Sequence, residues 1–460
     1  MTDLETQYNQ LITPLRAAFQ EGMTHDLAWR RGQLDALERL LEENEQSILD
    51  AMHRDFGKPP QEAFMAEVAF VISELRYARR RIERWSRRRP VDTPMVGQPG
   101  RSYVQPEPLG VVLIIGAWNY PVQLVLAPLI PALAAGNAAI LKPSELTPHT
   151  SALIAELVPR YLDRKAVAVV EGGVPETSAL LKLRFDHIFY TGGAAVGKIV
   201  MQAAAEHLTP VTLELGGKSP AIIDRDADLK SAARRLVWGK TLNAGQTCVA
   251  PDYVLISADQ RDELIEHMRA CLEDMFGADV IDSADYASIV NQRHFERLSG
   301  LLQHGRVAIG GRVDHERQRI EPTVLVDVDQ DSELMQEEIF GPLLPVIEVP
   351  DLDRAIGYVR SGDKPLSAYL FTKSDASKQR FLSEITAGSA CINDVIIFMS
   401  VPELPFGGVG MSGMGQYHGK AGFDLFSHLK SVMQRGRWPE VNVRFAPYSA
   451  FKMKLLKLLG

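Results

Sequence analysis

Cys248 is the residue best placed to do covalent chemistry, and it lies in the segment Asn243–Ala250. The chain holds only 3 cysteines in 460 residues, so a disulfide framework is excluded. The segment contains a glycine and follows a helical pattern that ends near Trp238. We therefore expect the thiol to stand exposed at the end of an element, where its thiolate can act as a nucleophile. Cys271 and Cys391 lie in amphipathic or mixed apolar stretches, the usual setting of a buried thiol.

Glu214 is the second candidate, 34 residues before Cys248. It belongs to a run that alternates like a β-strand from Val211 and breaks at Gly216 and Gly217. Desolvation disfavours the ionised form of a carboxylate among apolar neighbours, which suits a proton acceptor that works near neutral pH. A buried, salt-bridged structural carboxylate is the alternative role.

Together, Cys248 and Glu214 resemble the active site of the aldehyde dehydrogenase superfamily, and further motifs follow in that family's order over nearly the whole chain. They are similar to its oxyanion loop (108–121), adenosine-ribose site (141–145), pyrophosphate turn (190–197), nicotinamide-ribose site (337–342) and late catalytic loop (405–413). The short N-terminus and the segments 246–253 and 417–420 are similar to the class 3 branch.

The resemblance implies a role for each matching residue. Cys248 would attack an aldehyde, and Asn119 with the Cys248 backbone N–H would stabilise the oxyanion. Glu214 would activate the water that hydrolyses the thioester. Glu338 would hold the nicotinamide ribose or take part of the base role, and the sequence does not divide these tasks. The implied cofactor-binding residues are Lys142, Glu145, Gly192, Gly193, Gly197, Trp118, Glu338 and Phe340.

The glycine-rich turn also decides between two kinds of nucleotide. Residues 192–198 fit the first seven positions of a P-loop, but Ile199 replaces the Ser or Thr that binds magnesium. A strand followed by a helix near Val196 still presents backbone N–H groups to a pyrophosphate, so a dinucleotide is predicted. Glu145 favours NAD by accepting from a ribose hydroxyl, whereas Lys142 would permit NADP as the alternative. No His/Cys cluster has metal-ligand spacing, and no metal is predicted.

Composition is that of a soluble globular protein, with 46% hydrophobic and 23% charged residues. The net charge of −8 argues against nucleic acid as a partner. The N-terminus lacks the basic and apolar regions of a secretory signal, so a cytoplasmic location is expected. The apolar stretch 122–139 is interrupted by polar residues, prolines and a glycine, which predicts a buried helix and turn rather than a membrane span.

Strand-like runs alternate with helix-length segments, which predicts an α/β fold with parallel sheets. The expected strands are 111–115, 138–141, 166–170, 187–191 and 211–215 in one series, and 219–223, 253–256, 323–328 and 368–371 in another. We predict a Rossmann-like dinucleotide-binding domain (1–84 and 106–213), a catalytic domain (214–423), and a small β bridging or oligomerisation element with a C-terminal tail (85–105 and 424–460).

The predicted function is NAD(P)-dependent oxidation of an aldehyde to the carboxylic acid. A cofactor-independent thiol esterase and a CoA-acylating aldehyde dehydrogenase are the alternatives, and the retained Glu214 argues against the second. An apolar tunnel is expected from four residues, which favours medium-chain aliphatic or aromatic aldehydes: Trp118, Tyr120, Phe398 and Met399. The basic amphipathic tail 445–460 favours docking in a homodimer over weak contact with a membrane surface.

Overall fold

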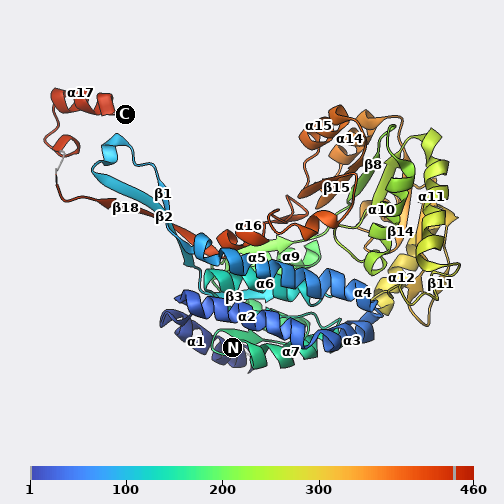
Figure 1. The fold of residues 1–460 in the computed structure, drawn as a ribbon, viewed down its shortest axis with the longest axis horizontal. Coiled ribbons are helices and arrows are strands. Elements are labelled where there is room, and N and C mark those ends of the chain that lie inside the picture. The colour runs from blue at the N-terminus through green and yellow to red at the C-terminus, as the bar shows by residue number, and fades with distance from the viewer. Residues whose placement is uncertain (1–2, 439–441, 460) are drawn as a thin grey trace.

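The computed structural model describes residues 3–438 and 442–459, so residues 1–2, 439–441 and 460 of the predicted terminal segments lie outside it. Two helix-covered sheets form the body, and a long β arm carrying the C-terminal helix projects from it (Figure 1). This arrangement confirms the predicted α/β fold with two sheets and a small β element. Among the described residues, no helix combines the length and the apolar character that crossing a bilayer requires.

The first sheet has six strands in the order β17-β7-β6-β3-β4-β5. All of its strands except β17 are parallel to their neighbours. Every residue of the central strand β3 is buried, as expected for a sheet that is covered on both faces. The strands are β3 (Val111–Ile115), β4 (Ala138–Lys142), β5 (Val167–Val169), β6 (His187–Thr191), β7 (Val211–Glu214) and β17 (Gly413–Met414).

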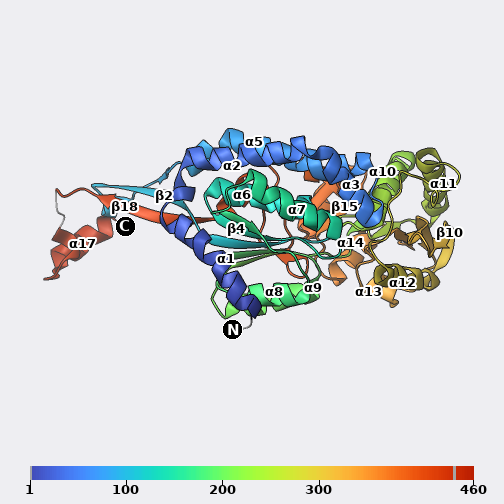
Figure 2. The ribbon, with the colours of Figure 1, turned by 90° about the horizontal axis from the view of Figure 1, so that it is seen from below.

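Helices cover both faces of this sheet (Figure 2). One face holds α6 (Gln123–Ala135) and α7 (Pro148–Tyr161), with α2 (Leu27–Glu43), α3 (Glu45–Phe56) and α5 (Ala69–Ser86) outside them. The other face holds α1 (Asp3–Gln20), α8 (Val174–Leu181) and α9 (Ala194–Ala205). Helix α6 is buried along its whole length, which confirms the buried helix expected in the apolar stretch 122–139.

The second sheet has seven strands in the order β10-β13-β14-β9-β8-β15-β16. They are β8 (Pro220–Ile223), β9 (Tyr253–Ile256), β10 (Arg306–Ile309), β13 (Thr323–Val326), β14 (Leu343–Glu348), β15 (Ser367–Phe371) and β16 (Ser389–Ile392). Helices α10 (Leu229–Thr241) and α11 (Ala258–Phe276) lie on one side, and α14 (Leu352–Ser361) and α15 (Asp375–Glu384) on the other (Figure 1). The remaining body elements are α4 (Pro60–Ala63), α12 (Gln292–Leu301), α13 (Glu333–Gln336), α16 (Gly419–Leu425) and the hairpin of β11 (Val313–Asp314) and β12 (Arg319–Ile320).

The arm is an antiparallel sheet of β1 (Arg89–Val91), β2 (Gly100–Pro108) and β18 (Ser427–Arg435). It brings together two chain segments more than half the sequence apart, and helix α17 (Ala450–Leu459) lies at its far end (Figure 1). Both outer strands, β1 and β18, have an unpaired edge within the described residues.

The structure differs from the sequence-based expectation at a few elements. The expected strands are present to within a residue or two, but six others were not predicted: β10, β11, β12, β14, β16 and β17. The helix before Cys248 ends at Thr241 rather than near Trp238. The edge strands β17 and β10 are antiparallel to their neighbours β7 and β13, so neither sheet is purely parallel.

Candidate active site

Cys248 follows a turn whose backbone is left-handed at three successive residues. Asn243, Ala244 and Gly245 have φ values of 54°, 51° and 73°. A non-glycine residue pays roughly 1–2 kcal/mol for this conformation, so neighbouring contacts must hold it. At Gly245 a Cβ would stand 2.2 Å from the carbonyl oxygen of Gly341, so only glycine fits there. The turn ends α10 abruptly and directs the next residues toward the interior.

The side chains of Gln246 and Thr247 hold this turn in place through hydrogen bonds. The Gln246 side chain donates to the carbonyl oxygens of Asn243 (2.9 Å) and Ser288 (3.0 Å), and it accepts from the Val290 N–H (3.0 Å). The Thr247 hydroxyl lies 2.6 Å from the Tyr120 hydroxyl. The backbone position of Cys248 is therefore set by contacts with two other parts of the chain, residues 288–290 and Tyr120.

The Cys248 thiol is half-buried, which corrects the expectation of an exposed thiolate. Burial raises its pKa well above the ordinary value, and the charges of Glu338 and Glu214 raise it further. The backbone N–H groups of Cys248 and Val249 act in the opposite direction. The resting form is thus the thiol, and a nearby base must take its proton before attack.

Asn119 lies in the loop after β3 and is buried. Its Nδ2 donates one hydrogen bond to the carbonyl oxygen of Gln246 (3.1 Å), two residues before the thiol. An amide nitrogen carries two hydrogens, so the second is available to an oxygen in the cavity that Asn119 and Cys248 both line. This is the geometry that a donor to an oxyanion on the Cys248 adduct needs.

Glu214 ends strand β7 and is almost completely buried, with 3% of its surface exposed. Neither carboxylate oxygen has a hydrogen-bond partner among the described residues. Burial raises its pKa well above the ordinary value. At Gly407 a Cβ would stand 3.0 Å from Glu214 Oε1, so the glycine leaves room for the carboxylate. Among the described residues Glu214 thus has no salt bridge, and burial favours its protonated form.

Glu338 approaches the same thiol from the loop after α13. Burial first, and then the charge of Asp252, raises its pKa to about 8. A hydrogen bond from the Gly217 N–H acts against that shift. At Gly216 a Cβ would stand only 1.8 Å from Glu338 Oε2, so the two-glycine break after β7 makes space for this carboxylate.

Lys218 and Asp252 hold the backbone on either side of Glu338, and neither residue was predicted from the sequence. Lys218 Nζ lies 2.5 Å from Asp252 Oδ2 and donates to the carbonyl oxygens of Leu334 and Glu337, both at 2.9 Å. Asp252 Oδ1 accepts from the Ile339 N–H at 3.0 Å. The only sequence signal was a lysine next to the two-glycine break, which is too common to single out.

A mainly apolar cavity of about 130 Å³ leads to Cys248. Tyr120 and Met399 line it, as predicted, whereas Trp118 and Phe398 do not. Trp118 packs instead on Phe340 and His294, and Phe398 packs on Phe406. The sequence pattern could not show which aromatic side chains turn away. The other lining residues include Met65, Ala66, Phe70, Leu124, Trp238, Leu242, Ile396, Ile397 and Tyr417.

Most of the predicted nucleotide residues lie at the carboxyl edge of the first sheet, where ligands of open α/β sheets bind, whereas Glu338 and Phe340 come from the loop between α13 and β14. Lys142 ends β4, is 2% exposed, and lies 3.8 Å from Glu145. Burial lowers the pKa of Lys142, and Glu145 opposes that shift.

Three glycines shape the turn between β6 and α9. A Cβ at Gly192 would stand 2.3 Å from the Tyr190 hydroxyl, and one at Gly197 would stand 2.9 Å from Leu215. Nothing lies within 4 Å of a Cβ built at Gly193, so the backbone there is open to a ligand. The first α9 N–H groups have no intrahelical acceptor, which fits a pyrophosphate. Among the described residues, no group of His, Cys, Asp or Glu side chains is arranged to hold a metal ion.

Comparisons with known proteins agree with this geometry. The model of the aldehyde dehydrogenase family matches residues 3–432. Aldehyde dehydrogenase family 3 member A2 of Mus musculus is 48% identical over 97% of this chain and 93% of its own length. The dimeric NADP-preferring aldehyde dehydrogenase of Rattus norvegicus is 49% identical over 91% of this chain and 92% of its own. A substrate-bound Staphylococcus aureus AldH structure has a TM-score of 0.96 and 44% identity, over 98% and 99% of the two chains.

Proposed function

This chain belongs to the aldehyde dehydrogenase family and oxidises aldehydes with NAD(P), and we propose that Cys248, Asn119, Glu214 and Glu338 carry out the chemistry. The observation that carries the proposal is that the Cys248 thiol shares an apolar cavity with the buried Asn119 amide and lies within reach of the charges of two carboxylates whose pKa values are raised. A thiol esterase would need neither the open glycine turn at α9 nor a second carboxylate.

The first half-reaction begins when one of the two carboxylates takes the Cys248 proton. The sulfur then adds to the aldehyde carbon and gives a thiohemiacetal, whose oxyanion accepts hydrogen bonds from Asn119 Nδ2 and the Cys248 N–H. One such donor typically stabilises the transition state by about 3–4 kcal/mol. The chemistry supplied by bound NAD(P) is acceptance of a hydride, which leaves a thioester on Cys248.

Glu214 is proposed as the base of the second half-reaction. Its carboxylate takes a proton from the water that attacks the thioester, and the carboxylic acid leaves as Cys248 is regenerated. Its lack of partners among the described residues supports this role, because an unpaired carboxylate is free to accept a proton. Glu338, supported by Lys218 and Asp252, is proposed chiefly to hold the nicotinamide ribose.

The remaining cofactor contacts are proposed for three places, two at the edge of the first sheet and one between Trp118 and the loop before β14. The turn at Gly192, Gly193 and Gly197 would hold the pyrophosphate, and Lys142 with Glu145 would flank the adenosine ribose. The Trp118–Phe340 pair would pack near the nicotinamide ribose. We propose that NAD is preferred, because Glu145 can accept from a 2′-hydroxyl, and that Lys142 allows NADP to bind. Comparing kcat/KM for the two cofactors tests this preference.

Medium-chain aliphatic or aromatic aldehydes are the proposed substrates, because apolar side chains line most of the cavity at Cys248. A substrate panel should show rising kcat/KM with apolar chain length. Preference for a charged semialdehyde would contradict this proposal.

A homodimer is proposed, with the arm and α17 at the interface. The unpaired edges of β1 and β18 and the exposed apolar side chains of Met433, Tyr448 and Phe451 support it. Deleting residues 436–460 should shift the mass measured by light scattering toward that of a monomer. Binding of the full chain, but not the deleted form, to anionic vesicles would support the membrane contact instead.

The direct test is NAD(P)H formation from aldehydes with and without CoA. Activity without CoA that disappears in Cys248→Ala supports the hydrolytic dehydrogenase. Activity that requires CoA would move the chain to the acylating reaction, and ester cleavage without any aldehyde oxidation would move it to the thiol esterase.

A further inference from the structure

The segment from Phe56 to Phe70 lies between α3 and α5 and contains an unusual stretch of helix. After the short helix α4, residues Phe64–Val68 form a π-helix, with the Ala69 N–H donating to the Phe64 carbonyl oxygen. Such π-turns occur frequently at functional sites. The sequence pattern shows only a helical region with a turn here. In the structure, α4 reaches from the first sheet toward the second (Figure 1).

A fully buried ion pair anchors this segment to the oxyanion loop. Lys58 Nζ lies 2.5 Å from Glu67 Oε1, and both side chains are 0% exposed. Lys58 also donates to the backbone carbonyl oxygen of Asn119 at 3.3 Å. Glu67 Oε2 accepts from the N–H groups of Val122 (2.8 Å) and Gln123 (3.1 Å). Buried charges are costly unless they are paired and hydrogen-bonded, so these contacts hold residues 119–123 in one place.

Glu62 provides the matching contact to the turn before Cys248. Its Oε1 accepts from the Asn243 N–H at 2.7 Å, at the first left-handed residue of that turn. The Asn243 side chain then donates to the carbonyl oxygens of Asn119 (2.9 Å) and Gln246 (3.0 Å). Lys58 and Asn243 therefore share the Asn119 carbonyl oxygen, and the oxyanion loop and the nucleophile turn are joined through this segment.

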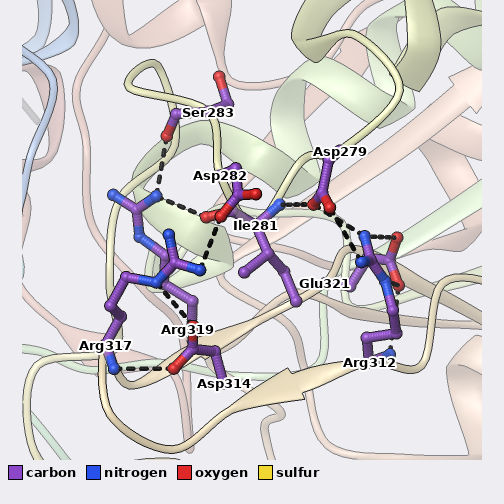
Figure 3. A network of polar contacts seen from close by, with 9 residues as sticks. All are labelled: Asp279, Ile281, Asp282, Ser283, Arg312, Asp314, Arg317, Arg319 and Glu321. Atoms are coloured by element: carbon purple, nitrogen blue, oxygen red, sulfur yellow. Dashed lines mark hydrogen bonds and ion pairs between the residues drawn. The ribbon is translucent and has the colours of Figure 1, made fainter.

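The same assembly is supported from outside by the loop before α12. The N–H of Ser288 donates to the Phe56 carbonyl oxygen, and the Ser288 carbonyl oxygen accepts from Gln246. Figure 3 shows the arginines of the β11–β12 hairpin converging on the start of this loop. Among them, Arg319 donates to the carbonyl oxygens of Ile281 (2.7 Å) and Ser283 (2.8 Å).

We propose that Glu62 is a positioning residue for aldehyde oxidation, which holds the left-handed turn at Asn243 so that the Cys248 thiol and the Asn119 amide face one point in the cavity. This inference rests on the proposed roles of Cys248 and Asn119. Glu62 does not touch the reacting atoms, and the Lys58–Glu67 pair keeps the Asn119 side of the assembly fixed.

The segment also forms part of the wall of the aldehyde cavity, so a shift of the segment would change the space available to the substrate. Met65, Ala66 and Phe70 line that cavity. A purely structural role for Glu62 would lower stability and cofactor binding along with activity. A positioning role predicts a loss confined to steps in which the thiol and the oxyanion donor must be aligned.

Glu62→Asp is the decisive variant, because it keeps the carboxylate but withdraws it from the Asn243 N–H. A misplacement of about 1 Å can cost roughly 100-fold in rate, so we expect first-turnover NAD(P)H formation to fall roughly 10- to 100-fold. Alkylation of Cys248 by iodoacetamide, cofactor affinity and thermal unfolding should stay close to wild type. Glu62→Gln keeps an acceptor oxygen and should retain most of the rate. Gln61→Ala, an exposed neighbour on α4, is the matched control and should behave as wild type.

An unchanged first-turnover rate in Glu62→Asp would overturn the proposal, and so would a loss shared equally by cofactor affinity and thermal unfolding. Should that variant fail to fold, Glu62→Ala replaces it, because alanine removes the acceptor of the Asn243 N–H without leaving a displaced carboxylate in the interior. The same selective loss is then expected, and an unchanged rate overturns the proposal. Wild-type protein that oxidises no aldehyde would instead refute the proposed function.

Discussion

Replacing Glu214 with methionine should make the protein more stable and nearly inactive at once. Both oxygens of this 3%-exposed carboxylate lack partners among the described residues, and a buried polar group left unsatisfied costs about 1–3 kcal/mol. Methionine has a similar length and no such requirement. Glu214→Met should therefore raise the free energy of unfolding by about that amount, because the active site stores this cost for function.

The stability gain should also depend on pH, with a sign fixed by the raised pKa. The folded-state pKa of Glu214 lies well above the ordinary value of 4.5, so the wild-type protein takes up a proton on folding above that pH. The contribution of Glu214 to the free energy of unfolding of the wild-type protein is fully present below the unfolded-state pKa. It is lost as the pH rises from that value toward the folded-state pKa. The difference in free energy of unfolding between Glu214→Met and the wild type should increase above pH 4.5 by up to about 1.4 kcal/mol per pH unit.

Urea unfolding across this pH range measures the gap, and stopped-flow NAD(P)H formation measures the chemistry. Loss of a general base should slow steady-state turnover roughly 10²- to 10⁴-fold while leaving the first turnover. Glu156→Met, an exposed carboxylate on α7, is the control and should change stability by no more than about 0.5 kcal/mol. A less stable Glu214→Met protein would refute the burial argument, and undiminished turnover would assign the base role to Glu338.

Three further outcomes follow from the site. Cys248→Ala should abolish both aldehyde oxidation and ester cleavage while Cys271→Ala leaves them intact, and residual activity would exclude Cys248 as nucleophile. Gly216→Ala places a Cβ 1.8 Å from Glu338 Oε2, so the KM for NAD(P) should rise about tenfold without slowing thiol alkylation; an unchanged KM would separate Glu338 from the cofactor. Ala66→Trp narrows the cavity and should lower kcat/KM at least about tenfold for octanal but little for propanal, whereas equal losses would contradict the substrate proposal.

Local sequence determined the elements and most of the reactive groups. The run at 111–115 is apolar at every position and β-branched at all but Leu113, and it forms the buried strand β3. Gly245 and Gly216 were recognisable from the sequence as breaks in regular structure. In the fold each leaves room for a close neighbour, the Gly341 carbonyl oxygen and the Glu338 carboxylate respectively. Side-chain period and backbone permissiveness are properties of neighbouring residues, so they are readable without a fold.

Tertiary structure alone decided how these groups meet. The half-burial of Cys248, the turning away of Trp118 from the cavity, and the link from Glu62 to Asn243 each depend on contacts between distant segments. The antiparallel strand β17 reaches β7 across about two hundred residues of chain for the same reason. Periodicity specifies which face of an element is apolar, but the partner of that face, and with it the pKa of a buried group such as Glu214, exists only once the chain has packed.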